Sequence, residues 1–268
     1  MHCEQHLGRL AAEAHSFADA VAASDLDVMV VPCPDWGVRD LARHVGGLYH
    51  WSSTIVEQQI VTETWPHQLP TAAPEDGDWA AWIRTRVEAA LTIFRATDPS
   101  ARVWTWGNDP HARTWPRRML YETVIHRLDL ATTNGQPLEV AAEIAAEGVD
   151  EWLENLRAVV QVPVATIATD QRTLSLAADD TGDAWRILLS PRGWRWDRDA
   201  SPGDAHVTGS AKELLLLLQG RGAGATRAEG DQVLLEAWLE ASSWASVAAA
   251  AIPSQLAREA LEEGYLAE

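Results

Sequence analysis

The spacing of apolar residues changes along this chain of 268 residues, from a helical period to short strand-like runs, and this change sets the fold class. In the first part, apolar residues recur at steps of three and four, which predicts amphipathic helices. The predicted helices cover residues 4–23, 38–55, 79–94, 116–134 and about 139–158. Two prolines and a glycine separate the first two predicted helices at 31–37, where the sequence is VPCPDWG.

Beyond Pro163 the chain changes to short apolar runs separated by Asp/Gly and Pro/Gly turns, which predicts strands. These runs lie at residues 173–176, 184–189, 193–196 and 205–208. Ser210 with Glu213 forms a capping box for a helix over 212–219, and Asp231 caps a further helix. The order of elements predicts a mainly α protein with an α+β part. We expect a helical domain over 1–160, a small α+β domain over 161–243 and a helical tail over 244–268.

The composition narrows the possible partners and the compartment. The formal net charge of -18 makes nucleic acid and anionic membrane surfaces poor partners, because both require patches of Lys and Arg. No run of about 18 apolar residues occurs, so we expect no transmembrane helix. The N-terminal segment carries charges throughout and lacks the apolar core of a signal peptide, which predicts a cytoplasmic protein. The two cysteines, Cys3 and Cys33, fit a reduced protein without a disulfide framework.

Three potential metal ligands are predicted to face the core of the helical domain. Glu122 and His126 are four residues apart in the helix over 116–134, so they lie on one face, one turn apart. His44 lies on the apolar face of the helix that starts near Val38. A buried carboxylate beside a buried imidazole needs compensation, and a shared metal ion provides it.

Two histidines and one glutamate form a ligand set that catalytic zinc sites use, with a further position left for water or a thiol. Each residue also has a structural interpretation. Glu-x-x-x-His suits a helix surface or a hydrogen bond in the core, and an inward histidine such as His44 is often satisfied within the core. The chain contains no Gly-x-Ser-x-Gly motif and no glycine-rich phosphate loop after a predicted strand, so a serine esterase and a nucleotide-binding enzyme are unsupported.

Several stretches of the chain carry a resemblance to a known family. They are residues 32–47 (PCPDWGVRDLARHVGG), 121–129 (YETVIHRLD), 209–221 (GSAKELLLLLQGR) and 229–231 (EGD). In this order, and over the chain to about residue 243, they resemble the mycothiol-dependent maleylpyruvate isomerase family. The resemblance implies a DinB-like four-helix bundle followed by a small, sterol-carrier-like α+β domain.

The resemblance also implies site residues and a type of reaction. It implies that His44, Glu122 and His126 bind a divalent metal ion, of which zinc is favoured. Mycothiol is then the thiol cosubstrate, activated as a metal-bound thiolate for addition to a small electrophilic substrate, either by an isomerase or by a thiol S-transferase. We expect Arg221 to act in catalysis by binding a substrate carboxylate, and Arg127 to bind the cofactor. The structural alternatives are a cation at a helix C-terminus for Arg221 and a salt link for Arg127.

Two other functions stay open on the sequence. Because the second domain resembles lipid-carrier modules, one alternative is a non-enzymatic protein that binds a small apolar ligand and holds a structural metal. The other is a metal-dependent hydrolase that uses metal-bound water. Three ligands with an open position favour an enzyme over a structural metal site.

Overall fold

The structure, a computed structural model, describes residues 3–75, 77–137, 139–159, 170–222 and 224–243. The helical tail predicted over 244–268 lies outside the described residues. The chain forms two compact units, the first ending at Glu139 and the second beginning at Val140. Among the helices that the structure describes, none combines the length and the apolar character needed to span a membrane.

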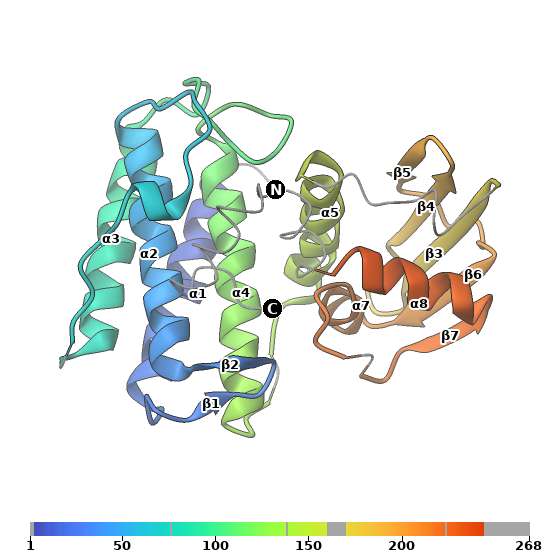
Figure 1. Cartoon of the computed structure of the whole chain (residues 1–268), viewed down its shortest axis with the longest axis horizontal. Coiled ribbons are helices and arrows are strands. Elements are labelled where there is room, and N and C mark those ends of the chain that lie inside the picture. The colour runs from blue at the N-terminus through green and yellow to red at the C-terminus, as the bar shows by residue number, and fades with distance from the viewer. Residues whose placement is uncertain (1–2, 76, 138, 160–169, 223, 244–268) are drawn as a thin grey trace. The chain divides into compact units, whose positions relative to one another are not determined.

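The first unit is a bundle of four helices (Figure 1). These are α1 (Cys3–Ala22), α2 (Val38–Glu57), α3 (Trp79–Ala96) and α4 (Thr114–Thr133). Helices α1 and α2 each pack against both α3 and α4. The side chains between them are apolar and fully buried, among them Leu10, Phe17, Leu41, Ile83 and Leu130. Burial of these stripes explains why the three- and four-residue periods predict the helices within a few residues.

Local signals set the ends of the two helices that carry the candidate ligands. Gly37 is the N-cap of α2, and its N–H donates to the carboxylate of Asp40 in the first turn at 3.1 Å. Pro116 lies in the first turn of α4, where its missing N–H costs nothing. Gly135 follows the end of α4 with a φ of 63°, a left-handed conformation that suits glycine.

A short hairpin precedes α2 where the sequence predicts only an interruption. Strands β1 (Met29–Val30) and β2 (Cys33–Gly37) pair antiparallel and contact α2 and α4. The strands are too short, and β2 too rich in proline and glycine, for a strand pattern to show in the sequence. The loop predicted between α2 and α3 also contains one short 3-10 helix, η1 (Pro66–Gln68).

The second unit contains a mixed five-stranded sheet with helices packed on it (Figure 1). Its elements are α5 (Ala142–Val159), β3 (Arg172–Ala178), β4 (Ala184–Ser190), β5 (Gly193–Asp197), β6 (Ala205–Gly209), α7 (Ala211–Leu218), β7 (Arg227–Gly230) and α8 (Gln232–Ala241). The strand order is β5-β4-β3-β6-β7, with β3 and β6 parallel and the other pairs antiparallel. Helix α7 contacts β3 and β6, and α8 contacts β6. A helical bundle and a separate α+β unit confirm the predicted fold class.

Two features of this unit are not predicted from the sequence. Helix α5, which the predicted bounds assign to the first domain, contacts α7 and β5, and its Asp150 accepts a hydrogen bond from Trp185 in β4 at 2.8 Å. The domain bounds 1–160 and 161–243 stay a prediction. Strand β7 is not predicted, because all four of its residues are exposed and it therefore lacks the alternation of a half-buried strand.

Candidate metal centre

The structure brings His44, Glu122 and His126 together inside the helical bundle. One ligand atom from each lies within 4.8 Å of the others. Nε2 of His126 is 3.4 Å from Oε2 of Glu122, and the rings of His44 and His126 are 5.0 Å apart and nearly perpendicular. The two histidines come from different helices, so the packing of α2 on α4 assembles the group.

Asp129 sets the orientation of His126. Its carboxylate is fully buried and lies 3.0 Å from Nδ1 of His126, one turn along α4. A carboxylate only accepts hydrogen bonds, so this contact is made through a proton on Nδ1, and Nε2 is the ring nitrogen that faces Glu122 and is left for an ion. A carboxylate behind a histidine in this way is the usual outer partner of a metal-binding imidazole. The carboxylate of Asp129 also accepts a weak bond from the thiol of Cys33 at 3.7 Å.

Cys33, His126 and Asp129 form a second group with atoms close enough to hold an ion. All three are buried, and they are already joined by the hydrogen bonds just described. An ion bound through Nδ1 of His126 would have to displace the proton that joins His126 to Asp129. The His44–Glu122–His126 group needs no such displacement, because it uses the other ring nitrogen.

Arg118 is a neighbour of the centre that the sequence does not single out. Its Nη2 donates to Oε1 of Glu122, four residues along α4, and its guanidinium lies 5.9 Å from the ring of Trp106. The i, i+4 spacing is the only sequence signal, and the same spacing occurs in ordinary surface ion pairs. Trp36, from β2, is a second missed neighbour: its ring is 4.8 Å from that of His44.

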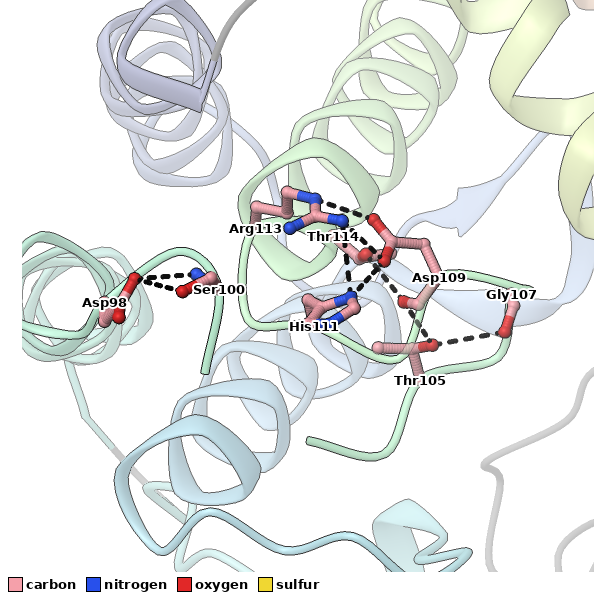
Figure 2. A network of polar contacts seen from close by, with 8 residues as sticks. All are labelled: Asp98, Ser100, Thr105, Gly107, Asp109, His111, Arg113 and Thr114. Carbon is pink, nitrogen blue, oxygen red and sulfur yellow. Dashed lines mark hydrogen bonds and ion pairs between the residues drawn. The ribbon is translucent and has the colours of Figure 1, made fainter. Parts of the chain in front are cut away.

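The loop between α3 and α4 carries Trp104 and Trp106 and is held by a polar network (Figure 2). The carboxylate of Asp109 accepts two bonds from Arg113, at 2.9 and 3.0 Å, and contacts His111. The backbone oxygen of Asp109 accepts the hydroxyls of Thr105 and Thr114, both at 3.0 Å.

The two loop indoles lie around Trp51 of α2, with ring centroids 5.8 and 6.0 Å away. Because the polar network holds the loop, it also holds Trp104 and Trp106 beside Trp51, and Trp106 is the ring next to Arg118.

Two further residues of α2 have shifted pKa values. Burial raises the pKa of Tyr49, whose hydroxyl is 2.7 Å from that of Thr123, so Tyr49 is a neutral hydrogen-bonding group between α2 and α4. Burial, and to a smaller extent the positive charge of Arg86, lowers the pKa of His50. Both effects favour uncharged side chains in this part of the bundle.

The two arginines expected at the site have other contacts in the structure. Nε of Arg127 donates to Glu13 on α1 at 2.5 Å, and its Nη2 donates to the backbone oxygen of Glu139 at 2.6 Å. This is the salt link that the sequence allows as an alternative. Arg221 follows α7 in the second unit, and its Nη1 donates to the backbone oxygen of Gln219 at 2.7 Å.

Comparison with known proteins gives matches to both units. Residues 7–131 match the family model described as the mycothiol maleylpyruvate isomerase N-terminal domain, and residues 143–237 match the C-terminal domain of the same family.

A crystal structure of the mycothiol-dependent maleylpyruvate isomerase superposes with a TM-score of 0.56 at 14% identity, over 85% of this chain and 93% of that one. A mutant of that enzyme with one histidine changed to alanine gives the same TM-score at 15% identity and the same coverage. At these identities the likeness shows a shared fold. The comparison with curated proteins gives no match.

Proposed function

The chain belongs to the mycothiol maleylpyruvate isomerase family, a family of enzymes, and from that premise we propose that it uses the thiol of mycothiol, at a divalent metal ion, to attack a small electrophilic substrate. The observation that carries the proposal is the convergence of His44, Glu122 and His126 on one point inside the bundle. The hydrogen bond from His126 to Asp129 supports it, because it occupies Nδ1 and leaves Nε2 as the ring nitrogen that faces Glu122.

The chemistry of the donor set fits zinc. Two imidazole nitrogens and one carboxylate are a set that catalytic zinc sites use, and three protein ligands leave a position for a further ligand. Among the described residues, this group offers the three without breaking a hydrogen bond to His126. With neutral imidazoles, the carboxylate of Glu122 is the one anionic ligand, so a divalent ion would keep a formal charge of +1.

A divalent ion supplies Lewis acidity, which keeps a coordinated thiol deprotonated at neutral pH, whereas a free thiol has a pKa near ~8.5. The chain itself contributes the positions of the donors and a wall of indole rings. Trp36 packs beside His44, and Trp106 lies beyond Arg118. These apolar rings exclude water from a nucleophile that is intrinsically strong when desolvated.

The same thiolate nucleophile serves two alternative types of reaction. In an isomerase, the sulfur forms a bond to a carbon of a cis double bond, the electron pair moves onto the neighbouring carbonyl, the new single bond rotates, and elimination of the sulfur restores a trans alkene. In a thiol S-transferase the carbon–sulfur bond remains, or a leaving group departs. Both use His44, Glu122 and His126 as ligands and not as bases.

The roles of the two expected arginines remain part of the proposal. Arg221 would bind a substrate carboxylate, and replacement by methionine should then raise KM for an anionic substrate more than it lowers kcat. Arg127 would bind the cofactor, and its bonds to Glu13 and Glu139 make a purely structural role the competing outcome. Lower thermal stability of Arg127→Met, with an unchanged KM for mycothiol, would establish the structural role.

The test starts with the metal. Purified protein should contain about one zinc ion per chain, and both His44→Ala and His126→Ala should lose most of it, while His15→Ala, a change on the exposed surface, should retain it. Full occupancy in both ligand variants would refute the centre.

The second step uses the cobalt-substituted protein. Adding mycothiol should change its visible spectrum, because a thiolate ligand alters the electronic environment of the ion. An unchanged spectrum would indicate a closed structural site. Activity on an ester or amide without any thiol would instead indicate a hydrolase.

A further inference from the structure

The two oxygens of Glu122 face different partners. Oε2 lies 3.4 Å from Nε2 of His126, on the side of the metal ligands, whereas Oε1 is the acceptor for Arg118. One carboxylate therefore joins the proposed metal centre to a guanidinium. Because each partner is positively charged when the centre is filled, they compete for the charge of Glu122.

The charges show what changes when an ion binds. Without an ion, Arg118 and Glu122 form a pair with no net charge. With a divalent ion on two neutral imidazoles and Glu122, the ion and its ligands carry a formal charge of +1; Arg118 adds one positive charge and the Asp129 carboxylate behind His126 subtracts one, which leaves the group at +1. The filled centre and Arg118 together are therefore net positive and attract an anion.

The exposure of the side chains shows which side an anion would reach. Asp129 is 0% exposed and His126 is 7% exposed, whereas Arg118 and Glu122 are 13% and 17% exposed. The centre is thus more open toward Arg118 than toward Asp129. On that side the guanidinium lies close to the ring of Trp106, and the network around Asp109 holds the loop that carries this ring (Figure 2).

We propose that Arg118 couples metal binding to carboxylate binding, by pairing with Glu122 in the metal-free protein and with a carboxylate of the bound ligand once Glu122 holds an ion. A carboxylate is the anion that a planar guanidinium binds best among small organic ligands, through two parallel N–H bonds. Contact with the face of Trp106 favours a fixed plane for those bonds. The inference rests on the metal centre of the proposed function and adds the class of ligand that Arg118 selects.

Coupling of this kind is reciprocal. If the ion raises the affinity for a carboxylate by some factor, the carboxylate raises the affinity for the ion by the same factor, and such factors are commonly about 5–150. Maleate is a suitable probe because it carries two carboxylates and is inert without a thiol. Zinc affinity is measured with free zinc fixed by a chelator buffer and constant ionic strength, with and without saturating maleate.

The wild type should bind zinc about tenfold more tightly when maleate is present. Arg118→Met should bind zinc without maleate at least as tightly as the wild type, because a competing cation is gone, and maleate should change that affinity less than twofold. Arg118→Lys keeps the charge and should keep part of the coupling. Arg84→Met, which removes a cation paired with Asp19 on another face of the bundle, should keep all of it. Maleamide, the uncharged analogue, should have no effect.

Three results would overturn the inference while leaving the proposed function intact. One is a wild type that binds zinc with equal affinity in both conditions. Another is coupling that persists in Arg118→Met, which would mean that maleate binds the ion directly. The third is an Arg118→Met protein that melts like the wild type but no longer binds zinc, which would make Arg118 a support for Glu122. A wild type that takes up no zinc would refute the proposed function itself.

Discussion

Asp129 illustrates how a single buried carboxylate prepares the centre. It is fully buried, its Oδ2 accepts the Nδ1 proton of His126 at 3.0 Å, and the thiol of Cys33 donates to the same oxygen at 3.7 Å. Burying a charge is costly unless it is hydrogen-bonded, so the two donors account for its presence in the core. The same bonds determine which nitrogen of His126 is available to an ion.

We predict that Asp129→Asn weakens zinc binding about 10- to 100-fold, the usual effect of removing an outer partner of a metal ligand. The amide keeps the shape of the side chain but has lost the charge that holds the Nδ1 proton. Competition against a chelating dye measures the dissociation constant. Asp19→Asn removes a carboxylate from the exposed surface of the same bundle and serves as the control. Equal zinc affinity in Asp129→Asn and the wild type would show that His126 is oriented by packing alone.

Glu122→Gln tests whether the glutamate is a ligand or a proton acceptor. Glutamine is neutral and has nearly the same shape, so metal affinity should fall while the fold is kept. An ion that stays bound keeps more of its charge, so it should hold a thiol deprotonated at equal or lower pH, but as a weaker nucleophile. We therefore expect a lower turnover at saturating metal with no upward shift in the acid limb of the pH–rate profile. A shift upward by about one unit or more would identify Glu122 as a proton acceptor and favour water as the nucleophile.

At the scale of the elements, the close approach of α2 and α3 depends on one glycine. A Cβ at Gly46 would lie 2.0 Å from Cζ3 of Trp82, whose indole N–H donates to the backbone oxygen of Ala72 at 2.9 Å. The indole is thus held in place and cannot turn away without losing that bond. At Gly47, one residue further along the same helix, a Cβ would meet nothing within 4 Å.

We predict that Gly46→Ala destabilises the protein by about 1–3 kcal/mol, the cost typical of overpacking. Gly47→Ala should be neutral or stabilise by about 0.5–1 kcal/mol, since alanine is the better helix former. Urea unfolding followed by circular dichroism gives the two free energies. If both variants changed stability equally and in the same direction, the close contact between α2 and α3 at Gly46 would be disproved.

Most elements found from the sequence have a buried face; an exception is β5, whose alternating tryptophans are predicted as a strand although none of its five residues is buried. The helices of the bundle and strands β3 to β6 have periodic apolar positions, and each is predicted within a few residues of its observed bounds. The hairpin β1–β2 and strand β7 are missed, because the former is too short and the latter fully exposed. Their hydrogen bonds depend on partners distant in sequence or on turns, which a periodic pattern does not record.

The residues of the candidate centre fall into two similar groups, those on helices with an apolar period and those that only the tertiary structure brings close. Helical spacing predicts that His44, Glu122 and His126 lie on inward faces of two helices, and the family resemblance implies that they are the ligands. The contribution of Arg118 is not, because its neighbour Trp106 comes from a loop without any period. Trp36 reaches the ring of His44 only through the hairpin. The positions of the candidate ligands are thus predictable from helical spacing, whereas the positions of the groups around them depend on tertiary contacts.

At the scale of the whole molecule, helix α5 is the last helix of the predicted first domain, and it packs on elements that follow it in the chain. Its Asp150 accepts the indole N–H of Trp185, a fully buried residue of β4, and two bonds from Arg198 at 2.8 and 2.6 Å. These contacts, and the packing of α5 on α7, hold the helix to the sheet that follows it in the chain. A break in the backbone after α5 would leave these contacts in place.

Limited proteolysis tests this arrangement together with the domain organisation. From the sequence we predict first cuts around residues 158–172, a segment largely outside the described residues, or in the 62–77 loop. The mass of the fragments locates the cut. Helix α4 is buried along most of its length, so a first cut within 115–134 would contradict its place as a central helix of the bundle.

A protein cut only around 158–172 should remain one particle under native conditions. Its N-terminal fragment still ends in α5, and α5 stays packed on α7 and bonded through Asp150 to the C-terminal fragment. Size-exclusion chromatography should therefore show both fragments in one peak, which separates when urea is added. Asp150→Ala leaves the indole N–H of the buried Trp185 without its acceptor, a loss of about 1–3 kcal/mol, whereas the exposed Arg198 keeps its pairing with Asp183. The two fragments of cut Asp150→Ala protein should separate at a lower urea concentration than those of the cut wild type. If the wild-type fragments separated without any urea, α5 would not be held by the second unit.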